Sequence, residues 1–306
     1  MQIKIERQIH MRKTLIAYIG IILTFVVLNS CDKGVEPEGT NYHNKILFTS
    51  SRSGKAQLYM MNPDGTNIQQ ITSGEHSHSG GRWSPDASKI VCSTDENTTT
   101  ACYSMIKVMN ADGTNQKLLD CGSQMSWSPD GKRIVFTLWP SAELGDLTTY
   151  IYSTNADGSD PLILTNNKGI WNGTPNWSPD GGKIAFGSSR DYSSPGTFTE
   201  IYLMNSDGSN QQRLTYTDSL TNTNPTWSPD GKKIAFSCNG LIALMNADGS
   251  EMKILDSLST GGLISWSTDG TRLAFGAGEI YTIKLDGSDI KKILTDSSVW
   301  GVDWSK

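Results

Sequence analysis

Short apolar segments with an alternating pattern recur along most of the chain, and each is bounded by a turn sequence. One ten-residue pattern places a Trp–Ser–Pro–Asp turn before an apolar run, and successive copies begin 38 to 50 residues apart. It reads WSPDASKIVC at Trp83, WSPDGKRIVF at Trp127, WSPDGGKIAF at Trp177, WSPDGKKIAF at Trp227 and WSTDGTRLAF at Trp266, and the chain ends in WSK at Trp304. Fixed-period repetition of this kind predicts a repeat architecture.

A second turn sequence keeps step with the first, and together they predict four strands per repeat. Its copies are MNPDG at Met61, MNADG at Met109, TNADG at Thr154, MNSDG at Met204, MNADG at Met245 and IKLDG at Ile283. Pro, Asp and Gly suit tight turns, and alternating segments such as IYLMN at 201–205 suit half-buried strands. We therefore expect an all-β fold, a six-bladed β-propeller of four-stranded antiparallel blades.

The two ends of the chain predict how the ring closes. The segment KILFTS from Lys45 matches the second strand of a blade, and the final VDWSK supplies a first strand. We expect the N-terminal strands and the C-terminal strand to share one blade, because closure removes exposed sheet edges. The repeat tryptophans are interpreted as structural residues packed between blades: Trp83, Trp127, Trp177, Trp227, Trp266 and Trp304.

WSPDGKKIAF and the MNADG-type turns resemble the WD40-like (PD40) repeat of the TolB propeller family, over residues 45–306. The same repeat occurs in the propellers of some prolyl-peptidase-like enzymes. The TolB resemblance implies a six-bladed, non-enzymatic, periplasmic protein that binds other envelope proteins. TolB proteins are soluble and carry an α/β domain before the propeller, whereas here a short linker precedes the first strand.

The start of the chain has the pattern of an export signal. Basic residues precede the apolar run LIAYIGIILTFVVL at 15–28, which suits a signal peptide and is short for a transmembrane helix. LNSC at 28–31 resembles a bacterial lipobox, which implies lipid attachment at Cys31. The alternative is an ordinary signal peptide with a chance cysteine. Met11 is an alternative start to Met1.

These features predict three regions and a location in the cell envelope. We expect a signal peptide at 1–30, the lipidated Cys31 with a flexible linker at 31–44, and the propeller at 45–306. Asp32 after the cysteine resembles an inner-membrane retention signal in some bacteria, whereas acidic residues near the cysteine accompany surface display in others. We expect a lipid anchor in the outer membrane, facing the periplasm or the cell surface, rather than in the inner membrane.

Charge and cysteine content limit the classes of function. The formal charge is −5, and removal of residues 1–30, with four basic residues and one acidic residue, leaves −8. Such a chain lacks the clustered lysine and arginine that phosphate contacts need, so we exclude nucleic acid as a partner. A disulfide between Cys92 and Cys102 is one expectation, and unpaired thiols are the alternative. No C-x-x-C pair supports a zinc site.

No catalytic constellation occurs, so we predict a protein that is not an enzyme and needs no cofactor. The sequence has no G-x-S-x-G motif, no P-loop and no nucleotide-binding glycine motif. Glu75, His76 and His78 could supply metal ligands if their segment is extended, because residues two apart then face the same way. With no fourth ligand evident, a solvated loop is the favoured interpretation.

Long loops are predicted on one face, where the second strand of a blade joins the third and where one blade joins the next. Tryptophans outside the repeat fall in or beside these loops, and exposed aromatic residues on a rigid scaffold often anchor partners. The predicted binding face comprises Trp139, Trp171, Arg190, Tyr192, Phe198, Trp300, His76 and His78. The alternative is that each tryptophan caps the small core of its own loop.

Two hypotheses about function follow. The first is a non-catalytic, membrane-anchored envelope lipoprotein that binds proteins through the long-loop face. The second is a carbohydrate-binding or carbohydrate-degrading propeller that uses the same face at the mouth of the channel.

Overall fold

The computed structural model describes residues 42–99, 102–139, 148–192, 198–217, 219–259, 262–276 and 278–305, and in these residues it contains strands and turns without a helix. Residues 42–306 form one compact unit. Since no helix occurs among these described residues, none is long and apolar enough to cross a membrane. The expected signal peptide, Cys31 and linker lie outside the described residues, apart from the last linker residues, 42–44.

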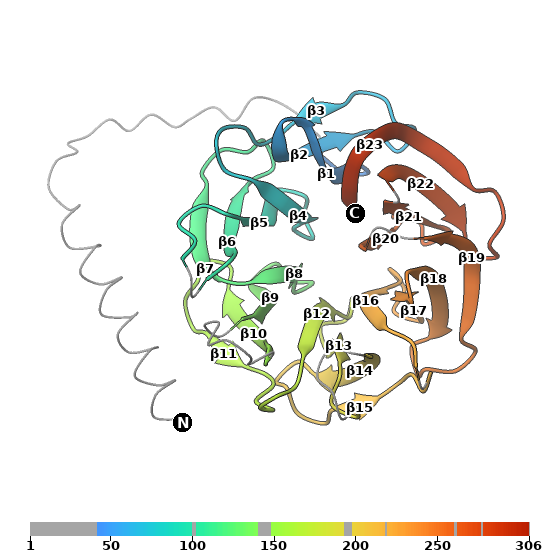
Figure 1. The fold of residues 1–306 in the computed structure, drawn as a ribbon. Helices are drawn as coiled ribbons and strands as arrows, with labels where there is room; N and C mark the ends of the chain where they lie inside the picture. The colour runs from blue at the N-terminus through green and yellow to red at the C-terminus, as the bar shows by residue number, and fades with distance from the viewer. Residues whose placement is uncertain are drawn as a thin grey trace, which may run out of the picture. The chain divides into compact units, whose positions relative to one another are not determined.

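Four of the sheets have four antiparallel strands each, joined in chain order (Figure 1). The first two comprise β4 (His78–Trp83), β5 (Lys89–Thr94), β6 (Met105–Asn110) and β7 (Lys117–Cys121), then β8 (Ser123–Trp127), β9 (Arg133–Leu138), β10 (Tyr150–Asn155) and β11 (Leu162–Ile163). The next two comprise β12 (Asn172–Trp177), β13 (Lys183–Ser188), β14 (Glu200–Asn205) and β15 (Gln212–Arg213), then β16 (Asn222–Trp227), β17 (Lys233–Cys238), β18 (Leu241–Asn246) and β19 (Lys253–Ser259).

The fifth sheet joins the two ends of the chain. It contains β20 (Ile264–Trp266), β21 (Arg272–Gly276), β22 (Gly278–Lys284), β23 (Lys291–Trp304), β1 (Ile46–Ser53), β2 (Lys55–Met61) and β3 (Gln69–Gln70), in that order. The long strand β23 pairs first with β22 and then, through its last residues, with β1. Divided at β23, this sheet yields two four-stranded units, the arrangement that a count of six blades requires. Figure 1 shows the sheets placed around a ring, and the fold is a β-propeller.

The core lies between adjacent sheets. The second strand of five units carries a phenylalanine at the same place, and all five are fully buried: Phe48, Phe136, Phe186, Phe236 and Phe275. Each cluster mixes residues of neighbouring four-stranded units; Val91 and Ile106 of the β4–β7 sheet, for example, pack with Phe136 of the next. Because a single sheet cannot bury both of its faces, each unit depends on its neighbours for stability.

The Trp–Ser turns lie together on one face, around a cavity of about 130 Å³ lined by all six repeat tryptophans. Trp127 Nε1 donates to the carbonyl of Arg82 at 3.2 Å, and Trp266 Nε1 donates to that of Thr226 at 3.1 Å. Both bonds cross from one sheet to the sheet before it. The indole rings therefore help to set the spacing of neighbouring units.

On this face, Asp303 near the end of β23 connects that strand to β4. Its carboxylate accepts from the backbone N–H of Trp83 at 2.8 Å and from the guanidinium of Arg82 at 3.1 Å. Burial raises the pKa of Asp303, although Arg82 opposes that effect. The start of the described chain is nearby, because the Tyr42 carbonyl accepts from the Ser305 hydroxyl and its ring lies 6.0 Å from that of Trp83.

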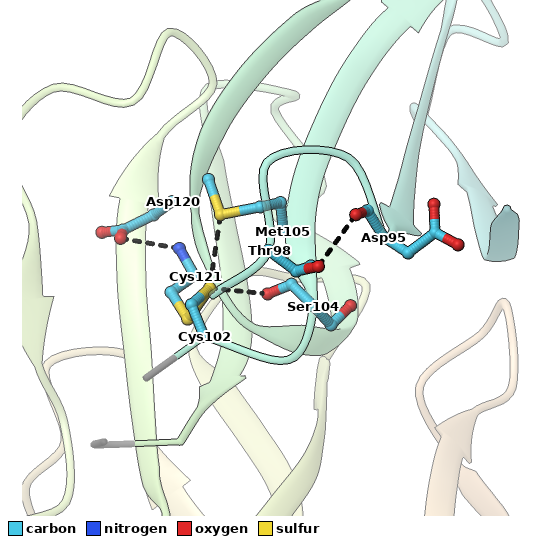
Figure 2. Close-up of a disulfide and its surroundings, with 7 residues drawn as sticks. All are labelled: Asp95, Thr98, Cys102, Ser104, Met105, Asp120 and Cys121. Carbon is cyan, nitrogen blue, oxygen red and sulfur yellow. Dashed lines mark hydrogen bonds between the residues drawn. A yellow bond between two sulfur atoms is a disulfide. The ribbon is translucent and has the colours of Figure 1, made fainter. Parts of the chain in front are cut away.

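The expected disulfide between Cys92 and Cys102 is wrong. Cys102 is bonded to Cys121, with Cα atoms 5.7 Å apart (Figure 2). The chain between β5 and β6 turns back so that Cys102 reaches the end of β7, where Met105 pairs with Cys121. Cys92 lies inside β5 as a fully buried free thiol, and burial raises its pKa to about 12. The alternative of unpaired thiols thus holds for Cys92 and Cys238.

Candidate functional site

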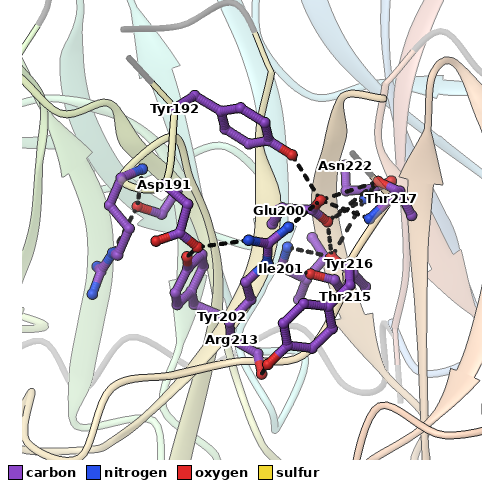
Figure 3. Close-up of polar contacts among 12 residues, drawn as sticks. Asp191, Tyr192, Glu200, Ile201, Tyr202, Arg213, Thr215, Tyr216, Thr217 and Asn222 are labelled. Carbon is purple, nitrogen blue, oxygen red and sulfur yellow. Dashed lines mark hydrogen bonds and ion pairs between the residues drawn. The ribbon is translucent and has the colours of Figure 1, made fainter. Parts of the chain in front are cut away.

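A polar cluster lies at the edge of the β12–β15 sheet, on the face opposite the Trp–Ser turns. Its members come from the connection between β13 and β14, from β14 and β15, from the connection that leads into β16, and from the first residue of β16. They are Asp191, Tyr192, Glu200, Tyr202, Arg213, Thr215, Tyr216, Thr217 and Asn222 (Figure 3). We call this set the Glu200 cluster.

Glu200 is fully buried at the start of β14, and its carboxylate is the centre of the cluster. It accepts hydrogen bonds from Tyr192 Oη at 2.9 Å, Arg213 Nη2 at 2.8 Å and Asn222 Nδ2 at 2.8 Å. It also accepts from the Thr215 hydroxyl and from the Thr217 backbone N–H. Burial alone would raise the pKa of Glu200, but these hydrogen bonds outweigh it and hold the pKa below its ordinary value.

Asp191 holds the other side of Arg213. Arg213 Nη1 donates to Asp191 Oδ2 at 2.9 Å, and the Tyr202 hydroxyl donates to the same oxygen. Burial and this hydrogen bond both raise the pKa of Tyr202, so the phenol stays protonated. Arg213 therefore bridges two carboxylates, one buried and one partly exposed, and ties the β13–β14 connection to β15 (Figure 3).

Tyr216 covers the Arg213 guanidinium from the solvent side. The guanidinium carbon lies 4.6 Å from the centre of the Tyr216 ring, a cation–π contact. Tyr216 is nevertheless 72% exposed. The cluster thus presents one aromatic ring to solvent, fixed from behind by a charged group.

The β1–β3 unit contains a neutral counterpart of the same arrangement. Tyr59 pairs with Gln70 where Tyr202 pairs with Arg213, and Gln57 takes the place of Glu200. Gln57 Oε1 accepts from the Thr72 hydroxyl, as Glu200 does from Thr215. Since amides suffice to organise the strands there, the charges of the Glu200 cluster are not required by the blade geometry.

Two residues of the predicted binding face belong directly to this region. The rings of Tyr192 and Phe198 lie 5.7 Å apart, edge to face, and the Tyr192 hydroxyl bonds to Glu200.

The Arg190 side chain makes its contacts within the fold. Its guanidinium lies 4.5 Å from the centre of the Tyr202 ring and donates to Gln211 Oε1 at 2.7 Å. Burial lowers the pKa of Arg190.

The three loop tryptophans differ in their exposure. Trp171 packs over Gly173 and Gly187, where an added Cβ would meet its ring at 2.5 and 2.9 Å. This contact favours the alternative for Trp171, that it caps the core of its own loop. Trp139, at the end of β9, and Trp300, in β23, are both exposed. The structure does not bring the predicted set into one patch.

The two histidines do not face the same way, so the basis of the metal interpretation is wrong. His78 is the first residue of β4 and is buried, with Nδ1 3.2 Å from Gln57 Oε1 and Nε2 3.3 Å from Lys107 Nζ. Burial and the neighbouring Lys107 lower its pKa to about 4. His76 precedes the strand and lies 3.3 Å from Asp95, while Glu75 is exposed. Within the described residues, no three His, Cys, Asp or Glu side chains gather as metal ligands.

Sequence reasoning missed the centre of the cluster. Glu200, Arg213 and Tyr216 carry no motif, and Glu200 is separated from its partners by up to 22 residues. One signal was available: a polar residue stands before IYLMN at position 200 and before LYMMN at position 57. Comparison of equivalent positions between repeats would have selected it.

Comparisons with known proteins agree with the fold. Among solved structures, TolB from Acinetobacter baumannii superposes with a TM-score of 0.70 at 22% identity, covering 86% of this chain and 67% of that one. A nidogen/laminin complex gives 0.65 at 13% identity, covering 86% and 98%. An oligogalacturonate lyase in complex with manganese gives 0.56 at 15% identity, covering 81% and 73%. These likenesses show the fold alone.

No curated protein matches the sequence. A family model described as the TolB beta propeller domain matches residues 27–137 and 120–305, which together span most of the chain. The chain therefore belongs to the TolB β-propeller domain family.

Proposed function

We propose that this protein is a non-catalytic scaffold of the bacterial cell envelope that binds another protein through its long-loop face. The observation that carries the proposal is the Glu200 cluster, in which both carboxylates are held by internal donors and fix two loops in one position. A loop surface that is rigid before binding loses little conformational entropy when a partner docks. Membership of the TolB propeller family supports a protein partner.

The proposal includes attachment to a membrane through a lipid on Cys31. The apolar run at 15–28 and the LNSC sequence support it, and an outer-membrane position facing the periplasm or the cell surface is part of the proposal. Tyr42, the first described residue, lies beside Trp83 at the face of the Trp–Ser turns.

The test is a crosslinked affinity purification from native membranes with single substitutions on two surfaces. We expect a specific partner to be recovered with the wild type and to be reduced at least about tenfold by Trp139→Ala or Tyr192→Ala. The matched control is Ile163→Ala, which removes an exposed apolar side chain from β11 at the outer edge. Recovery of the same proteins with all four chains would contradict binding through this face.

A further inference from the structure

Tyr216 has the properties of a preformed stacking platform. One side of its ring is occupied by the Arg213 guanidinium at 4.6 Å, and its hydroxyl is 3.4 Å from the Arg213 carbonyl. These contacts restrict the ring while 72% of the residue remains exposed. An aromatic ring whose position is set in advance loses little side-chain entropy when a ligand packs against its open side.

A hydrogen-bond acceptor lies next to this platform. Asp191 contacts the same guanidinium, its side chain is 40% exposed, and only its Oδ2 is used by Arg213 and Tyr202. Among the described residues, no donor contacts Asp191 Oδ1. That oxygen can accept a hydrogen bond from a ligand hydroxyl group beside the Tyr216 ring.

The surroundings of Tyr216 distinguish between kinds of ligand. Among the described residues of the β12–β15 sheet and its connections, Tyr216 is the one large hydrophobic side chain that is exposed, and exposed Ile163 and Ile254 belong to the two neighbouring sheets. A protein hot spot needs neighbouring contacts that exclude water, and one exposed ring in a sheet does not supply them. A pyranose ring needs less area, because its C–H groups meet the electron-rich face of one aromatic ring while its hydroxyls bond at the edge.

Local charge also limits the ligand. Arg190 and Arg213 are balanced by Asp191 and Glu200, so the site offers no net charge to an ionic ligand. Glu200 is fully buried, and all its contacts are internal.

We propose that Tyr216 and Asp191 form a subsite that binds a neutral saccharide without cleaving it. This subsite is independent of the protein partner proposed above.

The test is isothermal titration of the full chain in detergent with four neutral oligosaccharides: maltotetraose, cellotetraose, chitotetraose and mannotetraose. One stacked ring and a few hydrogen bonds correspond to a Kd of about 0.1–5 mM for at least one of them. Tyr216→Ala should weaken that binding at least about tenfold, which corresponds to about 1.4 kcal/mol. Tyr216→Phe should retain it, because the ring is kept.

The matched control is Tyr103→Ala. Tyr103 is another tyrosine in a strand connection and is 65% exposed, and no aromatic ring or guanidinium group among the described residues contacts it. The Tyr103→Ala variant should bind the oligosaccharide as tightly as the wild type does. The proposal is overturned if the wild type binds none of the four sugars at about 10 mM, or if Tyr216→Ala binds as well as the wild type. Equal loss in Tyr216→Phe and Tyr216→Ala would also contradict stacking. None of these outcomes depends on the protein partner.

Discussion

At the scale of single residues, Glu200 is a charged group that is fully buried in the fold. A fully buried carboxylate is costly unless every lone pair is satisfied, and here an arginine, a tyrosine, an asparagine and two threonines satisfy it. Removing one partner of a buried charged network is strongly destabilising, because the remaining charge is left buried without a partner. This cost exceeds the stability that the intact network adds in comparison with neutral side chains.

Glu200→Gln should therefore destabilise the fold. The amide keeps the shape but removes the charge that Arg213 faces, and it turns an NH₂ group toward existing donors. We expect a loss of about 2–4 kcal/mol in the free energy of unfolding, measured by chemical denaturation. The matched control is Glu279→Gln, at the equivalent place near the start of β22. Its carboxylate contacts the Tyr281 hydroxyl and exposed Lys292, and the substitution should give no measurable change. Equal effects of the two substitutions would argue against the role given to Glu200.

Equivalent positions also show which residue roles could be read from the sequence. The repeat tryptophans and turn residues were readable because their chemistry is local and recurs in every copy. The Glu200 cluster could not be read from the sequence, because it depends on which loops meet across a sheet edge. The position of His78 was not readable either, because the start of β4 between His76 and His78 decides which side chain is buried. The prediction of the Cys92–Cys102 disulfide was wrong because it also depended on contacts that the sequence does not show. The fold of the loop brings Cys102 to Cys121.

At the scale of strands and turns, the repeated Asp–Gly sequence has a role between sheets as well as within them. Gly208 has a φ of +86°, and a Cβ at this position would lie 2.7 Å from the Leu164 carbonyl oxygen of the preceding sheet. The glycines of four other copies approach a backbone carbonyl of the preceding unit in the same way, as Gly113 does at Ile71, whereas Gly158 makes only an ordinary contact with the Leu119 side chain. The sequence indicated the turn but could not indicate this approach.

Two glycines separate the cost of backbone strain from the cost of this close approach. Gly54→Ala places a side chain at φ +103° with nothing within 4 Å, and should cost about 1 kcal/mol. Gly208→Ala adds a clash with backbone and should cost about 2–4 kcal/mol, because a neighbouring sheet must shift. Thermal and denaturant unfolding of both variants measures the difference. A Gly208→Ala variant as stable as Gly54→Ala would show that the sheets are free to move apart.

At the scale of the whole molecule, the turn aspartates predict how stability responds to pH. In eleven of them hydrogen bonds from nearby Ser, Thr or backbone groups hold the pKa below its ordinary value of 3.8: Asp64, Asp86, Asp112, Asp130, Asp157, Asp180, Asp207, Asp230, Asp248, Asp269 and Asp286. A pKa that is lower in the folded state adds stability above the unfolded value, and this stability is lost as the pH falls through the folded value.

We therefore expect stability to fall steeply below about pH 4. Buried His78 adds an earlier, smaller fall that begins below about pH 6.5, because its folded pKa is lowered to about 4 and the unfolded chain binds the proton first. Glu200 acts in the same direction, since its pKa is also lowered. Asp303 acts in the opposite direction as a single group, because burial raises its pKa. The measurement is the midpoint of thermal unfolding by circular dichroism at pH 3, 4, 5 and 7, at constant ionic strength. Equal midpoints at pH 3 and pH 7 would contradict the proposed contribution of the turns.

The pairing of β23 with β1 has a consequence for biosynthesis. The backbone N–H of Lys45 donates to the Ser305 hydroxyl at 2.7 Å across 260 residues of sequence, so these partners cannot meet until β23 has been synthesised. Until then β1 lacks a neighbour on one side, and the partly made chain exposes a strand edge open to aggregation. A chain in which β1 waits for β23 is suited to export in an unfolded state, with folding completed after transport. Loss of the residues of β23 that pair with β1 would therefore affect the first strand of the propeller as much as the last.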